Sequence, residues 1–348
     1  MLLDPTLTTK PPQVTPQDAE TCARRFYGLE LNAHPLSGER DRNFRMDGQD
    51  GRQFLLKFSN PAEAVEIVNL QTCVLNHIRQ KDPTLPIPHM VAANDGAFET
   101  AIELDDGRWS ILRMLTFLPG TPLHQSERTS RQRRALGHCL ARLDRALEGF
   151  THPAANHDLL WNVAAAHRLK GMIEGVADPA RRQLLQNFMA DYEASVLPQL
   201  KGLRAQLIHN DFNLGNVLVD PDDSEAVAAV IDFGDIVHGP LVGEIATAAA
   251  YQLGDDPDPL RGAAEMIGAY DAVLPLQHTE KAVLLDLVTA RLVITVLITE
   301  WRAARYPDNY QYIMRNNGLA WKGLDQFQRL SRDEASAQLL QFCSSGDK

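Results

Sequence analysis

The chain has 348 residues, of which 44% are hydrophobic and 23% are charged, and its formal net charge is −11. This length exceeds what one average domain needs, so we expect two lobes with sizeable cores. The negative charge disfavours nucleic acid as a partner, because binding to a phosphate backbone requires a positively charged surface.

The expected compartment is the cytoplasm. The N-terminal residues lack the order of basic, apolar and small residues found in a secretory signal. The longest apolar run, 290–299, is shorter than the roughly 20 residues that a membrane helix needs, so no membrane partner is expected. Cysteines are scattered without a CxxC pair, which indicates reduced thiols and no zinc site. The sequence does not specify the oligomeric state.

The first third of the chain predicts a small β-rich lobe. After a loose lead-in over 1–15, its expected elements are a helix over 18–27, a hairpin over 43–59, a helix over 60–81 and a hairpin over 98–118. Asp-Gly steps in the first hairpin tolerate the positive φ of a tight turn, and Asn60-Pro61 is typical of a helix start. Strand patterns begin at Leu36.

The remaining chain predicts a larger helical lobe. A Pro- and Gly-containing break at 118–123 marks the boundary, which gives an N-terminal lobe over 16–117 and a C-terminal lobe over 118–348. Helices are expected over 128–150, 159–175, 180–199, 240–253, 260–272 and 279–305, and three short strands over 206–232. The fold class is therefore α+β, with a β-rich lobe followed by a helical lobe.

Polar residues gather between the short strands. The segment 205–260 contains eleven acids and no Lys or Arg, which indicates a site for metal cations, a cationic substrate or both. Asp211 follows a strand and can accept a proton from a hydroxyl group, while Asn216 and Asp232 carry oxygen ligands suited to magnesium.

Each of these pieces alone also fits an ordinary Asx-turn or strand-end cap, and only the combination favours a catalytic site. The spacing from Asp211 to Asn216, followed by "IDFGD" around Asp232, resembles the catalytic loop and Asp-Phe-Gly segment of the protein-kinase-like fold. In that pattern His209 is a scaffold that fixes the loop and has no chemical role.

A kinase also needs residues that hold a nucleotide. Lys57, in the strand "FLLKFS", is the candidate for the ATP phosphates, and Glu66 is the preferred acidic partner, with Glu63 and Gln71 as alternatives. The loop over 37–43 has one glycine, so phosphate contact would depend on Gly38, Arg40, Arg42 or Asn43; the alternative is an ordinary charged turn. Backbone groups from Leu115 to Phe117 are the candidates for the adenine edge, with a plain edge strand as the alternative.

Features of protein kinases are missing from the catalytic region. Asn210 replaces the usual arginine, Asn213 stands where a lysine is common, and no activation segment follows Gly234. The phosphate acceptor should therefore be a small molecule.

The sequence resembles the aminoglycoside phosphotransferase and choline kinase superfamily, and within it the hydroxylysine-kinase-like branch. The matching stretches include "LSGERDRNF", "FLLKFSNP", "LTFLPGTPL", "HNDFNLGNVLV" and "VIDFGDIVHGPLVGEIA", and the resemblance runs from about 28 to 325. It implies a two-lobed protein-kinase-like fold, Asp211 as base, Asn216 and Asp232 as magnesium ligands, and Lys57 on the phosphates. Glu244 stands where many relatives have Asp, so it either braces the catalytic loop or touches the substrate.

Acidic, aromatic and basic residues are candidates for binding the acceptor. Asp235 and Glu244 can pair with an amine, and Trp161, with the ring of Tyr251, can receive it by a cation–π contact. Arg291 and Arg302, on one expected helix, can hold a carboxylate, although solvated or ion-paired helix positions explain both arginines as well.

The sequence thus predicts an ATP- and magnesium-dependent small-molecule kinase whose acceptor is a hydroxylysine-like amino acid or an amino alcohol. Rival interpretations are a kinase of the same superfamily that acts on an aminoglycoside, choline or homoserine, and an inactive kinase-like nucleotide-binding protein. GTP remains an alternative donor at this point.

Overall fold

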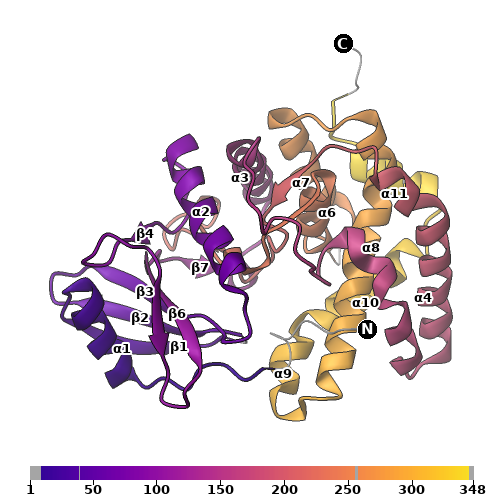
Figure 1. Cartoon of the computed structure of the whole chain (residues 1–348). Coiled ribbons are helices and arrows are strands. Elements are labelled where there is room, and N and C mark those ends of the chain that lie inside the picture. The colour runs from indigo at the N-terminus through magenta and orange to yellow at the C-terminus, as the bar shows by residue number, and fades with distance from the viewer. Residues whose placement is uncertain (1–8, 39, 255–257, 345–348) are drawn as a thin grey trace. The chain divides into compact units, whose positions relative to one another are not determined.

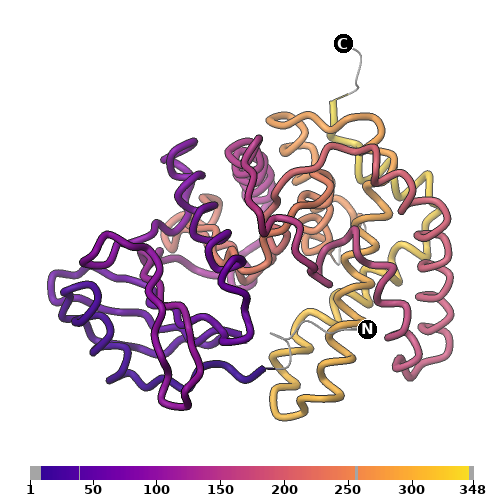
Figure 2. The backbone as a smooth tube through the Cα atoms, in the orientation of Figure 1, coloured from indigo at the N-terminus to yellow at the C-terminus, as the bar shows by residue number. Residues whose placement is uncertain are grey.

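The structure, a computed structural model, describes residues 9–38, 40–254 and 258–344. The chain divides into two compact units. Unit 1 comprises Met1–Gly120, Phe150–Asp158 and Ala228–Ile231, and unit 2 comprises the remaining segments, Thr121–Gly149, Leu159–Val227 and Asp232–Lys348. Figure 2 lets the chain be followed through both units by residue number. The first crossing, between Gly120 and Thr121, falls within the break at 118–123, while residues 1–8 of the expected lead-in lie outside the described residues.

The described part of unit 1 contains a six-stranded sheet (Figure 1). Its order is β1-β2-β3-β6-β4, with β5 also paired to β6, and the strands are β1 Leu31–Leu36, β2 Arg42–Gly48, β3 Gln53–Phe58, β4 Met90–Val91, β5 Thr100–Glu103 and β6 Trp109–Thr116. Alternating burial in β2 and β3 directs Phe44, Met46 and Leu56 into the core, as a half-buried antiparallel sheet requires. Both expected hairpins are confirmed, since β2 pairs with β3 and β5 pairs with β6.

The first helix of unit 1 also agrees with the sequence. Helix α1, Pro16–Cys22, begins at a capping box formed by Thr15 and Asp18. It continues as the π-helical turn η2, Ala23–Tyr27, and stops at Gly28, whose φ of 66° suits a residue without a Cβ.

Two features of unit 1 differ from the expectation. Strand β1 was not expected before Leu36, because Pro35 and exposed polar residues weaken its pattern; such residues are tolerated on an edge strand. Helix α2, Val65–Lys81, begins later than Asn60, with Ala64 as its cap. The Asn60 side chain instead donates to Arg40 O at 2.9 Å, and so its interactions stabilise the preceding loop.

The described part of unit 2 is mainly helical (Figure 1). Its helices are α3 Ser130–Leu147, η4 Val163–Gly175, α4 Pro179–Asp191, η5 Tyr192–Val196, α5 Leu197–Leu200, α6 Val242–Ala250, α7 Arg261–Val273, α8 His278–Ala303, α9 Tyr310–Ile313, α10 Asn317–Phe327 and α11 Arg332–Leu340, with short 3₁₀ turns η3 Leu123–Gln125, η6 Phe233–Asp235, η7 Pro307–Asn309 and η8 Met314–Asn316. The helix expected over 159–175 is a 3₁₀ helix, and the helices after Arg305 were not predicted.

Helix α8 packs against α6, η4 and α10 and is the central helix of unit 2. By length and composition it is able to cross a membrane, and it is longer than the apolar run at 290–299. However, 89% of its most apolar 18-residue window is buried inside the protein. Packing within unit 2 therefore explains why this helix is apolar.

Short strands carry the polar segment singled out in the sequence. The three expected strands are confirmed as β8 Ala205–Ile208, β9 Val217–Val219 and β10 Val227–Val230. Strand β9 pairs with β7, Thr121–Pro122, and β8 pairs with the unexpected β11, Val237–Pro240. Because β8 and β11 run side by side, the residues after β8 and before β11 meet at the same end of this strand pair.

Candidate active site

The loop that follows β8, residues 209–216, is compact and internally hydrogen-bonded. Asn210 has a φ of 63°, a left-handed conformation that Asn tolerates better than most residues. The side-chain oxygen of Asn213 accepts the backbone N–H groups of Gly215 at 2.7 Å and of Asn216 at 3.1 Å. The loop is therefore fixed by its own asparagine side chains.

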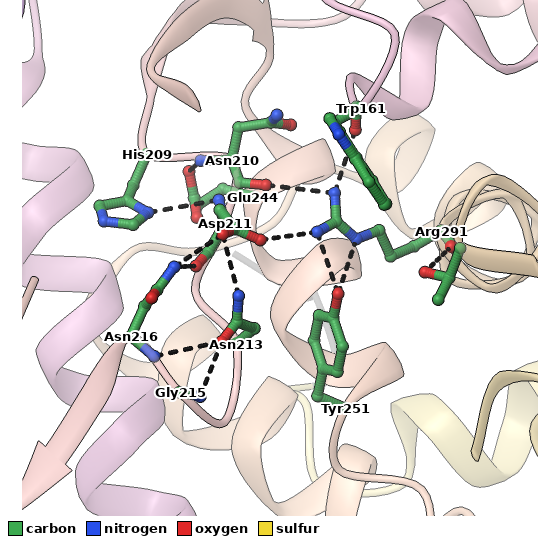
Figure 3. Close-up of polar contacts among 11 residues, drawn as sticks. Trp161, His209, Asn210, Asp211, Asn213, Gly215, Asn216, Glu244, Tyr251 and Arg291 are labelled. Atoms are coloured by element: carbon green, nitrogen blue, oxygen red, sulfur yellow. Dashed lines mark hydrogen bonds and ion pairs between the residues drawn. The ribbon is translucent and has the colours of Figure 1, made fainter. Parts of the chain in front are cut away.

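Both carboxylate oxygens of Asp211 are held in place (Figure 3). Oδ2 accepts the side-chain amides of Asn213 at 2.9 Å and Asn216 at 2.6 Å. Oδ1 accepts an N–H of Arg291 in helix α8 at 2.7 Å. This arrangement fixes the orientation of the carboxylate. A group that acts on a substrate held at one position needs such a fixed orientation.

Burial raises the pKa of Asp211 to about 6, with smaller contributions in the same direction from Asp235 and Asp232. The positive charge of Arg291 opposes this rise. A carboxylate whose pKa lies this close to neutrality is well suited to accept a proton from a hydroxyl group.

His209, the first residue of the loop, is fully buried. Its ring makes edge contacts with Phe212 and Phe233, at centroid distances of 6.5 and 4.7 Å, and Nδ1 accepts the backbone N–H of Asp211 at 3.3 Å. These contacts suit the scaffold role expected for His209.

Asn216 and Asp232 present oxygens that fit a hard cation. The amide nitrogen of Asn216 bonds Asp211, which leaves its carbonyl oxygen for a ligand. Asp232 is exposed, has a φ of 62°, and directs one carboxylate oxygen to Gly234 N. No group of three or more His, Cys, Asp and Glu side chains able to hold a metal ion occurs among the described residues. One amide and one carboxylate match Mg²⁺, which keeps several waters and shares substrate phosphates.

Glu244, the first acid of α6, is fully buried and accepts the backbone N–H of Asn210 at 2.8 Å. Burial raises the pKa of its carboxyl group. Of the two roles left open by the sequence, these contacts fit a brace for the catalytic loop better than a substrate contact.

In unit 1, Lys57 lies on β3 and pairs with Asp41 at 3.0 Å, with both side chains largely buried. The expected pairing with Glu66 is not found, because Glu66 lies on the exposed face of α2. Gln71, the alternative, accepts a hydrogen bond from the buried Arg113 at 2.9 Å. The acid that faces Lys57 therefore comes from the loop between the first two strands and not from the helix.

Within the loop over 37–43, Gly38 has little space around it, and Glu39 lies outside the described residues. A Cβ on Gly38 would stand 2.9 Å from Asp41 O and 3.1 Å from the Asn43 amide, so only glycine fits there. Arg40 O accepts the side chain of Asn60. Gly38, Arg40 and Asn43 thus lie next to the Asp41–Lys57 pair.

The candidates for the adenine edge lie at the end of β6. Leu115 is buried and its strand register places it between Leu55 of β3 and Met90 of β4. The backbone N–H groups of Thr116 and Phe117 already bond His89 O and Gln53 O, at 2.9 and 3.1 Å. Neither N–H group can therefore donate to an adenine ring unless it gives up its present hydrogen bond.

Three of the acceptor candidates lie near Asp211. Arg291 is 2% exposed and bonds Asp211 directly, and its guanidinium lies 5.1 Å from the ring centroid of the partly buried Trp161. Asp235 is buried and close enough to affect the pKa of Asp211.

Two interactions at the site were missed from the sequence. Asp41 was not predicted, although it lies two residues before Asn43, which pairs with Lys57 in the β2–β3 register. Tyr251 was considered only as a ring for an amine, yet its hydroxyl accepts two hydrogen bonds from Arg291. No signal in the sequence joins Tyr251 to Arg291, because packing of α6 against α8 brings them together.

Comparisons with known proteins show the family of the chain. The chain matches the phosphotransferase enzyme family over residues 33–276. It is 26% identical over 339 residues to a hydroxylysine kinase of Mus musculus, covering 90% of this chain and 89% of that protein, and 25% identical over 342 residues to one of Danio rerio, covering 95% and 96%.

Solved structures share the fold. An amicoumacin kinase in complex with AMP-PNP and Ca²⁺ has a TM-score of 0.66 at 14% identity, covering 89% of this chain and 94% of that one. A microcompartment-associated aminopropanol kinase has a TM-score of 0.58 at 18% identity, with 93% of each chain covered.

The chain has the fold of kinase-like phosphotransferases. The chain belongs to the phosphotransferase enzyme family. It is an enzyme that transfers a phosphoryl group to a hydroxyl group of a small molecule.

Proposed function

We propose that this enzyme is an ATP- and Mg²⁺-dependent kinase whose acceptor is a hydroxylysine-like amino acid or an amino alcohol. The observation that carries the proposal is the fixed Asp211 carboxylate, with the carbonyl oxygen of Asn216 and the carboxylate of Asp232 nearby. The hydroxylysine kinases and the aminopropanol kinase among its relatives support this class of acceptor.

Each of the main site residues then has a defined task. Asp211 orients the acceptor hydroxyl and takes its proton, and Asn216 and Asp232 hold Mg²⁺. ATP supplies the γ-phosphoryl group, and Mg²⁺ held by Asn216 and Asp232 would neutralise charge on its phosphates. Lys57 and the loop over 37–43 bind the ATP phosphates. For this, the ammonium group of Lys57 exchanges its contact with Asp41 for one with a phosphate. Most of the acceleration comes from positioning and charge neutralisation.

The charge around Asp211 favours an acceptor with an amine. Burial and the neighbouring Asp235 and Asp232 raise the pKa of Asp211, while Arg291 is the cation that opposes them. Trp161 is partly exposed, and because the guanidinium of Arg291 lies over one face of its ring, an ammonium group would use the other face. An amine-bearing acceptor is therefore more compatible with this region than a neutral sugar.

A phosphorylation screen tests the proposal. The purified protein is incubated with Mg²⁺ and ATP and with four acceptor classes, namely hydroxylated amino acids, amino alcohols, neutral sugars and aminoglycosides, and phosphorylated products are measured by mass spectrometry. We expect products only with the first two classes, and none with Asp211→Asn. Equal turnover by Asp211→Asn, or phosphorylation confined to sugars or aminoglycosides, would contradict the proposal.

A further inference from the structure

Arg291 uses all of its hydrogen-bonding capacity inside unit 2 (Figure 3). A guanidinium has five N–H donors. Nε and Nη2 both donate to Tyr251 Oη, Nη1 donates to Trp161 O and Asn210 O, and Nη2 also donates to Asp211 Oδ1. With all five hydrogen bonds made, no donor is left for the carboxylate of an acceptor.

The packing around Arg291 keeps it in this position. Its side chain is 2% exposed, and the guanidinium carbon lies 5.1 Å from the ring centroid of Trp161 and 5.5 Å from that of Tyr251. Helix α8 is itself buried and packs on α6 and η4, so the backbone that carries Arg291 is equally constrained. A planar guanidinium held by two rings and five hydrogen bonds is a rigid support for whatever it contacts.

The hydrogen bonds of Asp211 show which of its oxygens is open to a hydroxyl group. An ionised carboxylate has about four lone-pair positions, two on each oxygen. Oδ2 accepts from both Asn213 and Asn216, so its two positions are filled. Oδ1 accepts from Arg291 and keeps the second position. An acceptor hydroxyl that bonds Asp211 without displacing a loop residue must therefore bind at Oδ1, next to the bond from Arg291.

We propose that Arg291 is a positioning residue that fixes Asp211 Oδ1 as the proton-accepting oxygen and that it does not bind the acceptor. The inference rests on the proposed function. In the transfer step, Oδ1 takes the hydroxyl proton while the acceptor oxygen forms a bond to the γ-phosphorus. The bridging P–O bond breaks, and its electron pair leaves with the nucleoside diphosphate.

A comparison of two acceptors tests this role. Hydroxylysine carries a carboxylate and 1-amino-2-propanol does not, and kcat and KM for both are measured with wild type, Arg291→Lys, Arg291→Gln and the exposed control Arg134→Gln. If Arg291 positions Asp211, the Arg291 variants lose about 100-fold in kcat with both acceptors and keep KM nearly unchanged. A raised KM for hydroxylysine alone, with kcat retained, would show that Arg291 binds the acceptor carboxylate and would overturn the proposal.

Chemical rescue separates positioning from general damage to the fold. In Arg291→Ala, millimolar guanidinium chloride should restore at least part of the lost kcat, because the ion can occupy the vacated space beside Oδ1. Methylammonium at equal concentration serves as the control and should restore less. Equal rescue by both ions, or rescue by neither in a variant with wild-type circular dichroism, would contradict the positioning role.

If the wild type phosphorylates neither acceptor, the proposed function is contradicted. A separate measurement then tests whether Arg291 and Asp211 are coupled. Urea unfolding midpoints are determined for Asp211→Asn, Arg291→Gln and the double variant. Midpoint shifts that are clearly less than additive support the coupling of Asp211 to Arg291, because the second substitution no longer exposes an unpaired buried charge. Additive shifts would overturn it.

Discussion

Two buried ion pairs, Asp41 with Lys57 in unit 1 and Asp211 with Arg291 in unit 2, have different surroundings. Burial acts to raise the pKa of Asp41, but the charges of Lys57 and Arg113 outweigh it and hold the pKa below its usual range. Burial raises the pKa of Asp211 to about 6, and Arg291 only partly opposes burial and the neighbouring acids.

The difference shows how similar contacts suit different tasks. Asp41 faces two cations and stays ionised, so its pair with Lys57 contributes to the stability of the loop and strand. Asp211 shares one cation with other carboxylates and remains close to accepting a proton at neutral pH. Surroundings rich in cations keep a carboxyl group ionised, and surroundings rich in acids raise its pKa toward that of a general base.

The largest expected effect comes from Asp211→Asn. The amide keeps the shape of the side chain but cannot take a proton, so kcat should fall by about 10²- to 10⁴-fold, as expected for loss of a general base. Steady-state kinetics measure the effect, and Asp222→Asn, an exposed residue of the following turn, is the control. If Asp41→Asn reduced kcat as much as Asp211→Asn, the distinction between the two pairs would be lost.

Asp41→Asn should act mainly on stability. An amide oxygen still accepts the backbone N–H of Asn60, but the charge that faces Lys57 and Arg113 is gone. We expect the free energy of unfolding to fall by about 2–3 kcal/mol, in the range for a charged hydrogen bond or a broken buried pair. Urea denaturation measures the change against the exposed control Asp105→Asn, and equal stability of the two variants would refute the prediction.

The same pair predicts a pH dependence. A lowered pKa in the folded state means that Asp41 contributes stability above the pKa of the unfolded carboxyl group, about 3.9, and that the contribution is lost as pH falls through the folded value. The stability difference between wild type and Asp41→Asn should therefore be constant from pH 7 to about 5 and shrink below about pH 4. A stability difference between wild type and Asp41→Asn that grows as the pH falls would contradict the prediction.

Tyr251→Phe should have the smallest effect. Arg291 loses the hydroxyl that accepts two of its N–H groups, yet its bond to Asp211 remains. A cost of about 1 kcal/mol corresponds to roughly a fivefold lower kcat. Kinetics of Tyr251→Phe are compared with those of Tyr310→Phe, whose ring is 53% exposed. A loss as large as that of Asp211→Asn would mean that Tyr251, and not Arg291, is the main support of the carboxylate.

Much of the site was predictable because it is local in the chain. Asp211, Asn213 and Asn216 bond one another within six residues, and such contacts follow from loop geometry. The two hairpins of unit 1 also follow from alternating burial and Asp-Gly turns. The start of α2 was not predictable, because the Asn60 side chain donates a hydrogen bond to Arg40 O. That contact joins residues 20 positions apart and depends on the tertiary structure.

The sequence by itself indicated the class of chemistry, since Asp211, Asn216 and Asp232 at their spacing resemble the catalytic loop and Asp-Phe-Gly segment of kinases. The tertiary structure decided which cation each acid faces. Asp41, just before β2, pairs with Lys57 of β3. Arg291 contacts Asp211 from helix α8, 80 residues further along the chain. Burial and neighbouring charge set the pKa of a carboxylate, and both depend on residues that only packing brings together.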